Sequence, residues 1–380
     1  MTRTREPDWQ PRSDHVQADQ IASYDAMRER CPVAYDGHDS WTVFRHADTV
    51  AIVDDTGTYS NRVSRHLQIP NGFDGDPHRG YRRIIDRYFT RERLAEFEPT
   101  LREVCARLVA GLPRGVDVEA MSTLAEPFAN DATCAFMGWP DSLRGPLRAW
   151  TDKNRRATFE EDREAMAAIA VEFDGHIRRQ LDARRGVPAT DPTGHLLAEA
   201  VDGRALSDDE LVSIIRNWTV GELSTIAASA GVVAGFLAGN QDVQTRLRTD
   251  PTLLDAATDE IQRINSPFVA SRRRVTTPTR VAGTDLAEGD RVYVVWASAN
   301  RDPRVFDDPD EFRLDRDQGA NLVYGRGVHY CPGAPLARLE LRVLFEELFA
   351  ATTTVRPGGG ETVTAHYPTG GFERLSLRFS

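Results

Sequence analysis

The longest regular pattern of apolar positions in this chain begins just after Ser207. Apolar residues recur there at helical spacing, at Leu211, Ile214, Ile215, Trp218, Ile226, Val233 and Leu237. Ser207 and the acidic residues 208–210 supply a cap and a first turn that favour a helix start. Roughly 27 residues at 1.5 Å each span about 40 Å, enough to cross a whole domain. The pattern predicts a long central helix that is buried and borders any internal site.

Helical patterns dominate the rest of the chain as well. They predict helices at 20–30, 47–54, from Pro77 onward, within 94–137 and 147–185, and at 253–264 and 336–350. Short β-rich runs predict strands at 33–35, 40–44, 279–282 and 291–296, and a C-terminal hairpin within 363–379. This pattern indicates a mainly α fold with a small β subdomain. Residues 1–18 are polar and are expected to precede one domain, 19–380.

Composition narrows the class of protein. Of the 380 residues, 40% are hydrophobic and 28% are charged, which is ordinary for a soluble globular protein. The formal net charge of -11 argues against a nucleic-acid partner. No signal-peptide pattern and no run of 18 apolar residues occurs, so we expect a cytoplasmic protein without membrane contact. The four widely spaced cysteines fit a reducing compartment and give no zinc spacing: Cys31, Cys105, Cys134 and Cys331.

One cysteine stands out by its surroundings. Cys331 lies in the stretch 324–338, between a glycine-rich approach at Gly325 and Gly327 and the start of a predicted helix. The glycines let the chain pass close to a flat ligand, and helix N–H groups stabilise a thiolate. Haem iron is one partner for such a thiolate. The alternative is a buried structural cysteine beside a turn.

This stretch carries a resemblance to a known family. The residues from Tyr324 to Gly333 match Phe-Gly-x-Gly-x-His-x-Cys-x-Gly, with Tyr324 in place of the phenylalanine. In this respect the chain resembles the cytochrome P-450 family of haem–thiolate monooxygenases, from about Asp76 to the C-terminus. The resemblance implies the P-450 fold, haem b bound through Cys331, and insertion of one oxygen atom from O2 into a small organic substrate, such as a secondary metabolite. It also implies a monomer supplied with electrons by a separate ferredoxin and its reductase, since no flavin or nucleotide domain is fused here.

Several separated residues match the family's haem contacts. His78 and Arg82 share one helix face and match a pair that binds a haem propionate, although a solvated basic helix face is the alternative. Arg274 best matches a further propionate-binding arginine, and His329 is a third candidate donor. The resemblance also implies a structural ion pair, Glu260 with Arg263; whether Arg313 joins it stays open.

The middle of the long helix departs from the family pattern Ala-Gly-x-Asp/Glu-Thr. Thr225 falls on the threonine that helps deliver protons, but Ser224 falls on the acid and Glu222 on the glycine. A carboxylate on an apolar helix stripe is costly unless it is paired or hydrated. Glu222 therefore either replaces the missing acid or pairs with a basic neighbour, and proton delivery through water is a third route.

Further features bear on substrate and partner. Candidate pocket residues are Trp218, Phe268, Val269 and Phe372. The charged segment 152–163 lies where the family places its lid helices, and the region looks short, which predicts an open pocket. Six arginines within 79–93 form a basic patch that suits an acidic electron donor, or an ordinary charged surface.

Three functions remain open at this point. The first is a monooxygenase that hydroxylates a small organic molecule. The second is a haem–thiolate enzyme with atypical chemistry, either coupling aromatic side chains in a peptide or using peroxide, which the loss of the acid at Ser224 favours. The third is a non-catalytic haem protein that senses a gas or another ligand. The sequence does not name the substrate.

Overall fold

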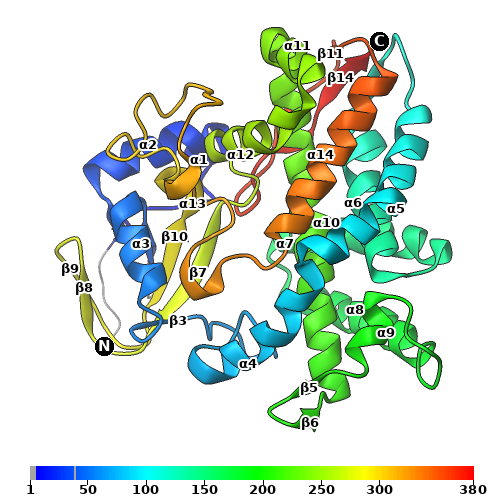
Figure 1. Ribbon diagram of the computed structural model, residues 1–380. Coiled ribbons are helices and arrows are strands. Elements are labelled where there is room, and N and C mark those ends of the chain that lie inside the picture. The colour runs from blue at the N-terminus through cyan, green and yellow to red at the C-terminus, as the bar shows by residue number, and fades with distance from the viewer. Residues whose placement is uncertain (1–5, 38–39) are drawn as a thin grey trace.

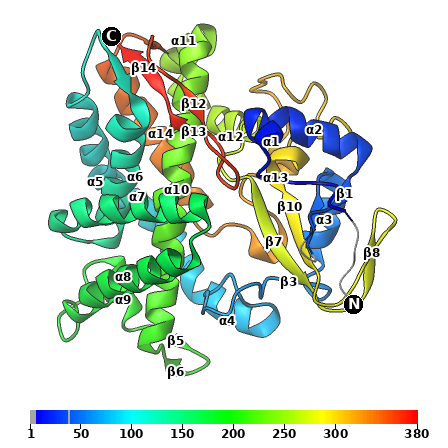
Figure 2. The same ribbon diagram turned by 180° about the vertical axis from the view of Figure 1, so that it is seen from behind.

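A computed structural model describes residues 6–37 and 40–380 of the chain. Helices gather on one side of the molecule and a twisted sheet on the other, and the C-terminus lies at the helical side (Figure 1). The view from behind shows the same division, with the long helix α10 (Asp208–Gly239) running along the boundary of the helical half (Figure 2). The prediction of a mainly helical fold with a small β part is confirmed.

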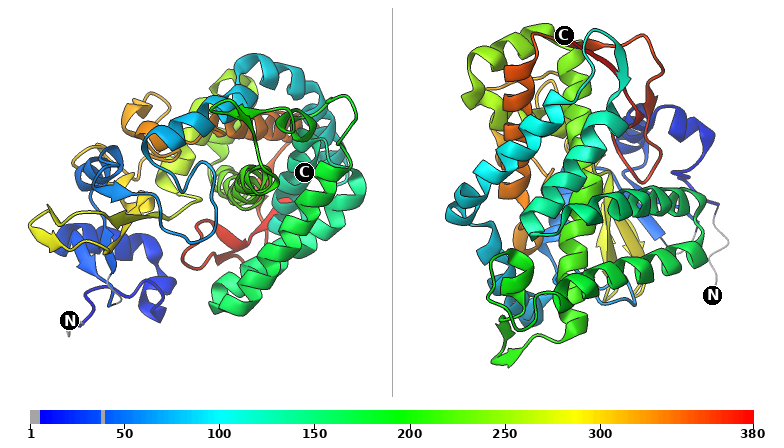
Figure 3. Two further views of the ribbon diagram at one scale, coloured as in Figure 1. Left: turned by 90° about the horizontal axis from the view of Figure 1, so that it is seen from below. Right: turned by 90° about the vertical axis from the view of Figure 1, so that its right-hand side faces the viewer.

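The helical half is built around α10. Seen end-on, α10 stands within a ring of other helices (Figure 3, left). The helices of this half are α4 (Gly75–Ile85), α5 (Arg91–Ala110), α6 (Glu126–Met137), α7 (Arg144–Glu160), α8 (Arg163–Asp182), α9 (Pro192–Leu196), α11 (Gln241–Thr249), α12 (Leu254–Ile264) and α14 (Ala334–Ala351). Short helical turns connect them: η1 (Asp86–Phe89), η2 (Met121–Ala125), η3 (Asp141–Leu143), η4 (Pro251–Leu253), η5 (Gln318–Ala320) and η6 (Gly327–His329).

The start of α10 follows directly from its sequence. Ser207 accepts the backbone N–H of Glu210, and the Glu210 side chain returns to the Ser207 backbone, which completes a capping box. The helix is long and apolar enough to span a membrane, but 67% of its most apolar window is buried inside the fold. It is therefore the core helix that the apolar pattern predicts.

The β-rich half has one principal sheet. Its strand order is β1-β2-β10-β7-β3, and only the β2–β10 pair is parallel. These strands are β1 (Val33–Tyr35), β2 (Ser40–Val43), β3 (Tyr59–Ser60), β7 (Ala270–Val275) and β10 (Arg291–Val295), accompanied by α1 (Asp14–Ala18), α2 (Gln20–Arg30), α3 (His46–Asp54) and α13 (Trp296–Ala299). Two-stranded ribbons are β5 (Ala200–Val201) with β6 (Arg204–Ala205), β8 (Thr279–Val281) with β9 (Thr284–Leu286), and β12 (Val363–Thr364) with β13 (Phe372–Arg374). A three-stranded sheet joins β4 (Asp117–Glu119), β14 (Ser376–Phe379) and β11 (Val355–Pro357).

Three details differ from the sequence-based expectations. The polar segment before residue 19 belongs to the domain from residue 6 onward, because Trp9 is buried and its ring lies 5.2 Å from that of Phe44. Residues 1–5 of that predicted segment, like 38–39 of the first hairpin, lie outside the described residues. Helix α4 begins at Gly75 rather than at Pro77. Strand β7, which the run of three arginines conceals, was not expected.

The lid region is not short. Helices α7 and α8 have 17 and 20 residues, and only the turn between them is brief. That turn is held from the N-terminal segment, since Arg12 pairs with Glu161 at 2.8 Å and donates to the Phe159 carbonyl at 3.2 Å. The charged residues that suggested a reduced lid lie on the exposed faces of two complete helices.

Candidate active site

The loop that carries Cys331 is shaped by its two glycines. Gly325 and Gly327 have φ values of 72° and 68°, in the left-handed region that glycine tolerates best. A Cβ on Gly327 would lie 2.9 Å from the Asp54 side chain, so this glycine also allows a close approach to α3. The loop closes when the Cys331 N–H donates to the Tyr324 carbonyl at 2.9 Å. The sulfur is thereby fixed immediately before α14.

Two opposing influences act on the pKa of the Cys331 thiol. Burial raises the pKa of the thiol, while the N–H groups of Gly333 and Ala334 and the guanidinium of Arg82 favour the thiolate. The N-terminus of α14 contributes its positive end in the same place. A cation bonded to sulfur would tip this balance to the thiolate, as a metal ligand requires.

Arg82 braces the cysteine loop from α4. One of its terminal nitrogens donates to the carbonyls of Val328 at 3.0 Å and Tyr330 at 2.8 Å, and its Nε pairs with Asp86 at 2.7 Å. These bonds use the Nε and one terminal nitrogen of the guanidinium. They show that Arg82 contacts the cysteine loop. Helix α4, which carries the matched residues His78 and Arg82, therefore lies beside that loop.

Two histidines meet beside the loop. The rings of His78 and His329 lie 4.1 Å apart, and the Nε2 of His329 is 3.3 Å from the Asp74 carboxylate. Although burial alone would raise the pKa of Asp74, hydrogen bonds from His329, Ser60 and Asn61 hold that pKa below its ordinary range. Burial and the neighbouring His329 and Arg82 lower the pKa of His78 to about 4, so its ring is neutral at pH 7.

The position of β7 changes which arginine faces the site. Side chains alternate along a strand, and here Arg273 faces inward with 5% exposure while Arg274 faces solvent. The structure therefore brings Arg273, not Arg274, to the site. Burial lowers the pKa of Arg273 to about 10, and Asp74 counteracts this. Arg273 shares the inward face of β7 with the buried apolar Val275, two residues on.

A short strip in the middle of α10 is open to solvent. Among residues of a mostly buried helix, Gly221 and Ser224 are exposed and Thr225 is partly exposed. A Cβ on Gly221 would meet no atom within 4 Å. The hydroxyl of Thr225 donates to the Gly221 carbonyl at 2.5 Å, and that of Ser224 donates to Val220 at 2.9 Å. Both hydroxyl oxygens keep free lone pairs on this open strip.

The side chain of Glu222 does not lie on this open strip but faces α14 and α6. Its carboxyl lies within reach of Glu340 on α14 and Thr133 on α6, and its Oε1 is shielded from solvent. Within 6–37 and 40–380, no arginine, lysine or histidine forms an ion pair with it. The expected alternative of a basic partner is therefore wrong, since the partner is a second acid.

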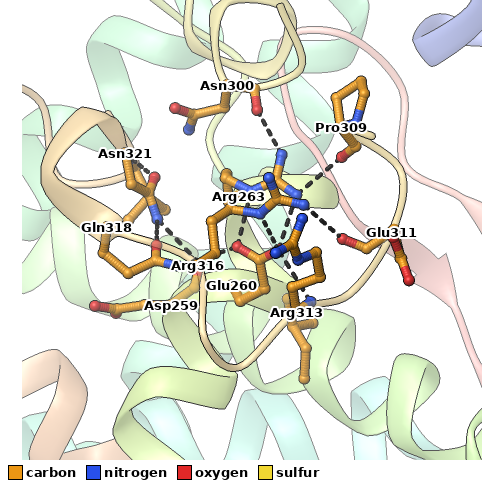
Figure 4. A network of polar contacts seen from close by, with 12 residues as sticks. Asp259, Glu260, Arg263, Asn300, Pro309, Glu311, Arg313, Arg316, Gln318 and Asn321 are labelled. Carbon is orange, nitrogen blue, oxygen red and sulfur yellow. Dashed lines mark hydrogen bonds and ion pairs between the residues drawn. The ribbon is translucent and has the colours of Figure 1, made fainter. Parts of the chain in front are cut away.

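The predicted Glu260–Arg263 pair is the centre of a larger network (Figure 4). Both residues are completely buried, and Arg263 bonds Glu260 at 2.8 and 2.9 Å. The third member is Arg316, whose Nε donates to Glu260 at 2.8 Å. The side chain of Arg313 instead turns to Asp315. These hydrogen bonds outweigh burial and lower the pKa of Glu260.

The predicted pocket residues lie in different surroundings. Phe268 is 44% exposed and bridges to Thr369 of the C-terminal segment, so it remains a wall candidate. Val269 is buried in the small core around Trp9. Phe372 is partly buried and packs against α10 at Gly235, at the edge of the main core, so the prediction that it contacts substrate is not supported by its position.

Trp218 is packed against the residues after α4. Its ring lies 5.2 Å from Tyr88 and 5.3 Å from Phe89, and its indole nitrogen is buried with no hydrogen-bond partner among the described residues. Phe89 in turn lies beside Gly333 of the cysteine loop, at 3.9 Å from a Cβ built there. Trp218 therefore belongs to the packing that joins α10 to this loop.

The donors around Cys331 suit a flat anionic cofactor. The Nε2 of His78 and the Nε of Arg273 are buried and lack hydrogen-bond partners among the described residues, a costly state that carboxylate groups would relieve. Together with the sulfur of Cys331, they would fit a haem with its propionates. The model for the family described as cytochrome P450 matches residues 142–352 of this chain.

The chain belongs to the cytochrome P450 family. It is 31% identical over 350 residues to the erythromycin C-12 hydroxylase of Saccharopolyspora erythraea, covering 88% of each protein. It is 30% identical to the cyclomarin C epoxidase CymV of Salinispora arenicola, covering 81% of this chain and 82% of that protein. The open structure of cytochrome P450 EryK from S. erythraea superposes with a TM-score of 0.89, at 28% identity and 98% coverage of both chains.

These findings assign the class of enzyme. The protein is a cytochrome P450 monooxygenase that uses a haem–thiolate iron cofactor. Sequence reasoning located Cys331, His78, Arg82 and His329 in one neighbourhood. It did not single out Arg273, Asp74, Arg316 or Glu340, because none of them stands in a motif that periodicity or spacing marks.

Proposed function

We propose that this P450 monooxygenase inserts one oxygen atom from O2 into a small organic secondary metabolite. The observation that carries the proposal is the thiol of Cys331 just before α14, with two buried donors beside its loop, the neutral ring of His78 and the cation of Arg273, that have unused bonding capacity. The named activities of relatives, a macrolide hydroxylase and an epoxidase, support this substrate class. Haem b, bound through Cys331, supplies the activation of O2 when present.

The chain's own residues hold the cofactor and manage protons. Cys331 would supply the sulfur ligand to the haem iron. His78, His329 and Arg273 hold the propionates, and Arg82 fixes the loop that presents the sulfur. Thr225 offers a hydroxyl on the open strip of α10, where it orients a proton donor toward the reacting centre. Phe268 and the adjoining residue Thr369 form part of the substrate wall.

Electrons come from a separate ferredoxin and its reductase, in the cytoplasm, and the enzyme acts as a monomer. The docking face is defined by α4, η1 and the outer side of the cysteine loop. Val328 and Tyr330 are exposed there at 53% and 37%, and arginines of α4 rim them. An apolar centre with a basic rim suits an acidic partner. Arg79 and Arg87 are ion-paired with acids of this chain, and Arg93 lies over the ring of Tyr88, which leaves Arg83 and Arg91 as the rim's uncommitted cations among the described residues.

A labelling experiment tests the reaction class. Purified holoenzyme with a ferredoxin system is screened against a panel of macrolactones and cyclic peptides for a shift in the haem Soret band. The best binder is then turned over under isotopically labelled O2. One labelled oxygen per product molecule is expected, and a Cys331→Ser variant gives no product and no red-shifted carbonyl adduct. Label arriving from water, or turnover with peroxide alone and none with the ferredoxin system, would overturn the proposal.

A second candidate is haem–thiolate chemistry without oxygen insertion, such as coupling aromatic side chains of a peptide. The presence of Ser224 where the family has an acid favours it, because such a site lacks the usual proton donor. In the labelling experiment this function appears as a cross-linked product that has lost two hydrogens and gained no labelled oxygen.

A further inference from the structure

A series of aromatic rings in contact leads from the cysteine loop to the residues after α4. The ring of Phe89 lies 3.9 Å from a Cβ built on Gly333, and the same Cβ lies 3.9 Å from the sulfur of Cys331. The centroid of the Trp218 ring lies 5.3 Å from that of Phe89 and 5.2 Å from that of Tyr88, within the usual range for packed aromatic pairs. The series therefore connects the sulfur-bearing loop to Tyr88 through packed rings.

Two of these rings, Trp218 and Tyr88, give up an electron more readily than a phenylalanine ring does. They differ in what happens to a proton. The indole nitrogen of Trp218 is buried and has no hydrogen-bond partner among the described residues. The hydroxyl of Tyr88 donates to the Glu199 carboxylate at 3.1 Å. An oxidised Tyr88 can therefore release its proton directly to a base, whereas an oxidised Trp218 has no base in contact and passes the charge on.

The surroundings of Tyr88 keep its proton in place until the electron leaves. Burial and the charge of Glu199 raise the pKa of the Tyr88 phenol, so the ring is neutral at pH 7. Arg93 lies over the ring at 5.9 Å, and this positive charge disfavours a second positive charge on the ring. Loss of the electron together with the proton avoids that repulsion. Glu199 is 19% exposed and pairs with Arg87 at 2.6 Å, so the accepted proton arrives close to solvent.

A second tyrosine nearby lacks this arrangement and provides a comparison. Tyr81 of α4 is as well buried as Tyr88, and its hydroxyl also donates to a glutamate, Glu210. Its ring packs against Phe73 at 5.6 Å. Among the described residues, no ring contact joins Tyr81 to Trp218. A buried tyrosine with a glutamate acceptor is thus present twice, but only Tyr88 is connected to the cysteine loop through a tryptophan.

We propose that Trp218 and Tyr88 form an electron-transfer pathway that reduces the oxidised haem when no substrate consumes its oxidising power, and so protects the enzyme from self-oxidation. The haem gains one electron from Trp218, Trp218 regains it from Tyr88, and Tyr88 gives its phenolic proton to Glu199. The products are a neutral tyrosyl radical and a protonated Glu199. A soluble one-electron reductant, such as ascorbate, then restores Tyr88, which takes the proton back. The pathway needs the haem but does not depend on the identity of the substrate.

Electron paramagnetic resonance after rapid freezing tests the pathway without turnover of a substrate. Substrate-free ferric holoenzyme is mixed with an organic peracid, which oxidises the haem directly. The wild type should give a free-radical signal that narrows when the protein contains ring-deuterated tyrosine. Tyr88→Phe and Trp218→Phe should both lose this signal, because the first removes the final electron donor and the second removes the relay. The matched control, Tyr81→Phe, should keep it.

Survival of the haem provides a second readout. Tyr88→Phe should lose its Soret absorbance faster than Tyr81→Phe when peracid is added, while both keep the wild-type carbonyl spectrum beforehand. Glu199→Gln should weaken the tyrosyl signal, because the proton acceptor is lost. If Trp218→Phe does not bind haem, the two tyrosine variants decide. A tyrosyl signal that persists in Tyr88→Phe, is lost equally in Tyr81→Phe, or is absent from the wild type would overturn the proposal. Each of these results would leave the proposed monooxygenase function standing, which the labelling experiment tests separately.

Discussion

The clearest quantitative prediction concerns Arg316, which the sequence did not mark. Its guanidinium donates to the buried carboxylate of Glu260 at 2.8 Å, and its side chain is 8% exposed. It also donates to three backbone carbonyls, those of Asp307, Asp308 and Glu311. A bond to a buried charge contributes about 1.5–3 kcal/mol, and each orphaned carbonyl adds to the loss. Glu260 still keeps Arg263, so we expect Arg316→Met to cost about 3 kcal/mol, the lower end of the range of about 3–5 kcal/mol for breaking a buried pair.

The control is three residues away. Arg313 contacts Asp315 at 3.4 Å, with its own side chain 38% exposed, so Arg313→Met should cost less than about 1 kcal/mol. Urea unfolding followed by circular dichroism measures both. For an m-value of about 3 kcal/mol/M, the Arg316 variant should unfold near 1 M lower than the wild type, while the Arg313 variant scarcely moves. Equal destabilisation of the two variants would refute the assignment of Arg316 as the third member of this network.

Three further predictions use matched positions. Arg273→Met should lose haem during purification while Arg274→Met retains it, read as the haem-to-protein absorbance ratio; equal retention would contradict the inward orientation of Arg273. Asp74→Asn should lower stability at pH 7 by about 1–3 kcal/mol. Because the folded pKa of Asp74 is depressed, its contribution is present above about pH 3.9 and is lost as pH falls through the folded pKa, so wild type and variant should converge on acidification and a constant gap would argue against it. Gly138→Ala and Gly115→Ala both replace a glycine of positive φ, but only the first adds a carbon 2.3 Å from another side chain, so urea unfolding should show an extra loss of about 1–3 kcal/mol at Gly138 alone.

Helix α10 shows which structural features the local sequence determines and which it does not. Its start, its length and its burial follow from the capping residues and the apolar period, which act within a few turns. The direction in which the Glu222 side chain points does not follow from these local residues. An apolar stripe says that a side chain faces the interior, but the second acid at Glu340 is more than a hundred residues away in sequence. Only the packing of α10 against α14 and α6 brings the two carboxyls together.

The same division holds at the haem-binding residues. The spacing of Gly325, Gly327 and Cys331 within one loop pointed to the family and to its chemistry, because a short motif fixes its own backbone. The choice between Arg273 and Arg274 depended on which face of β7 turns inward, and that is set by pairing with β10 and β3. A shift of one residue reverses every side chain of a strand. The sequence therefore determined the cofactor and reaction class, whereas the tertiary structure decided which charges gather around it, since those contacts join segments that are distant along the chain.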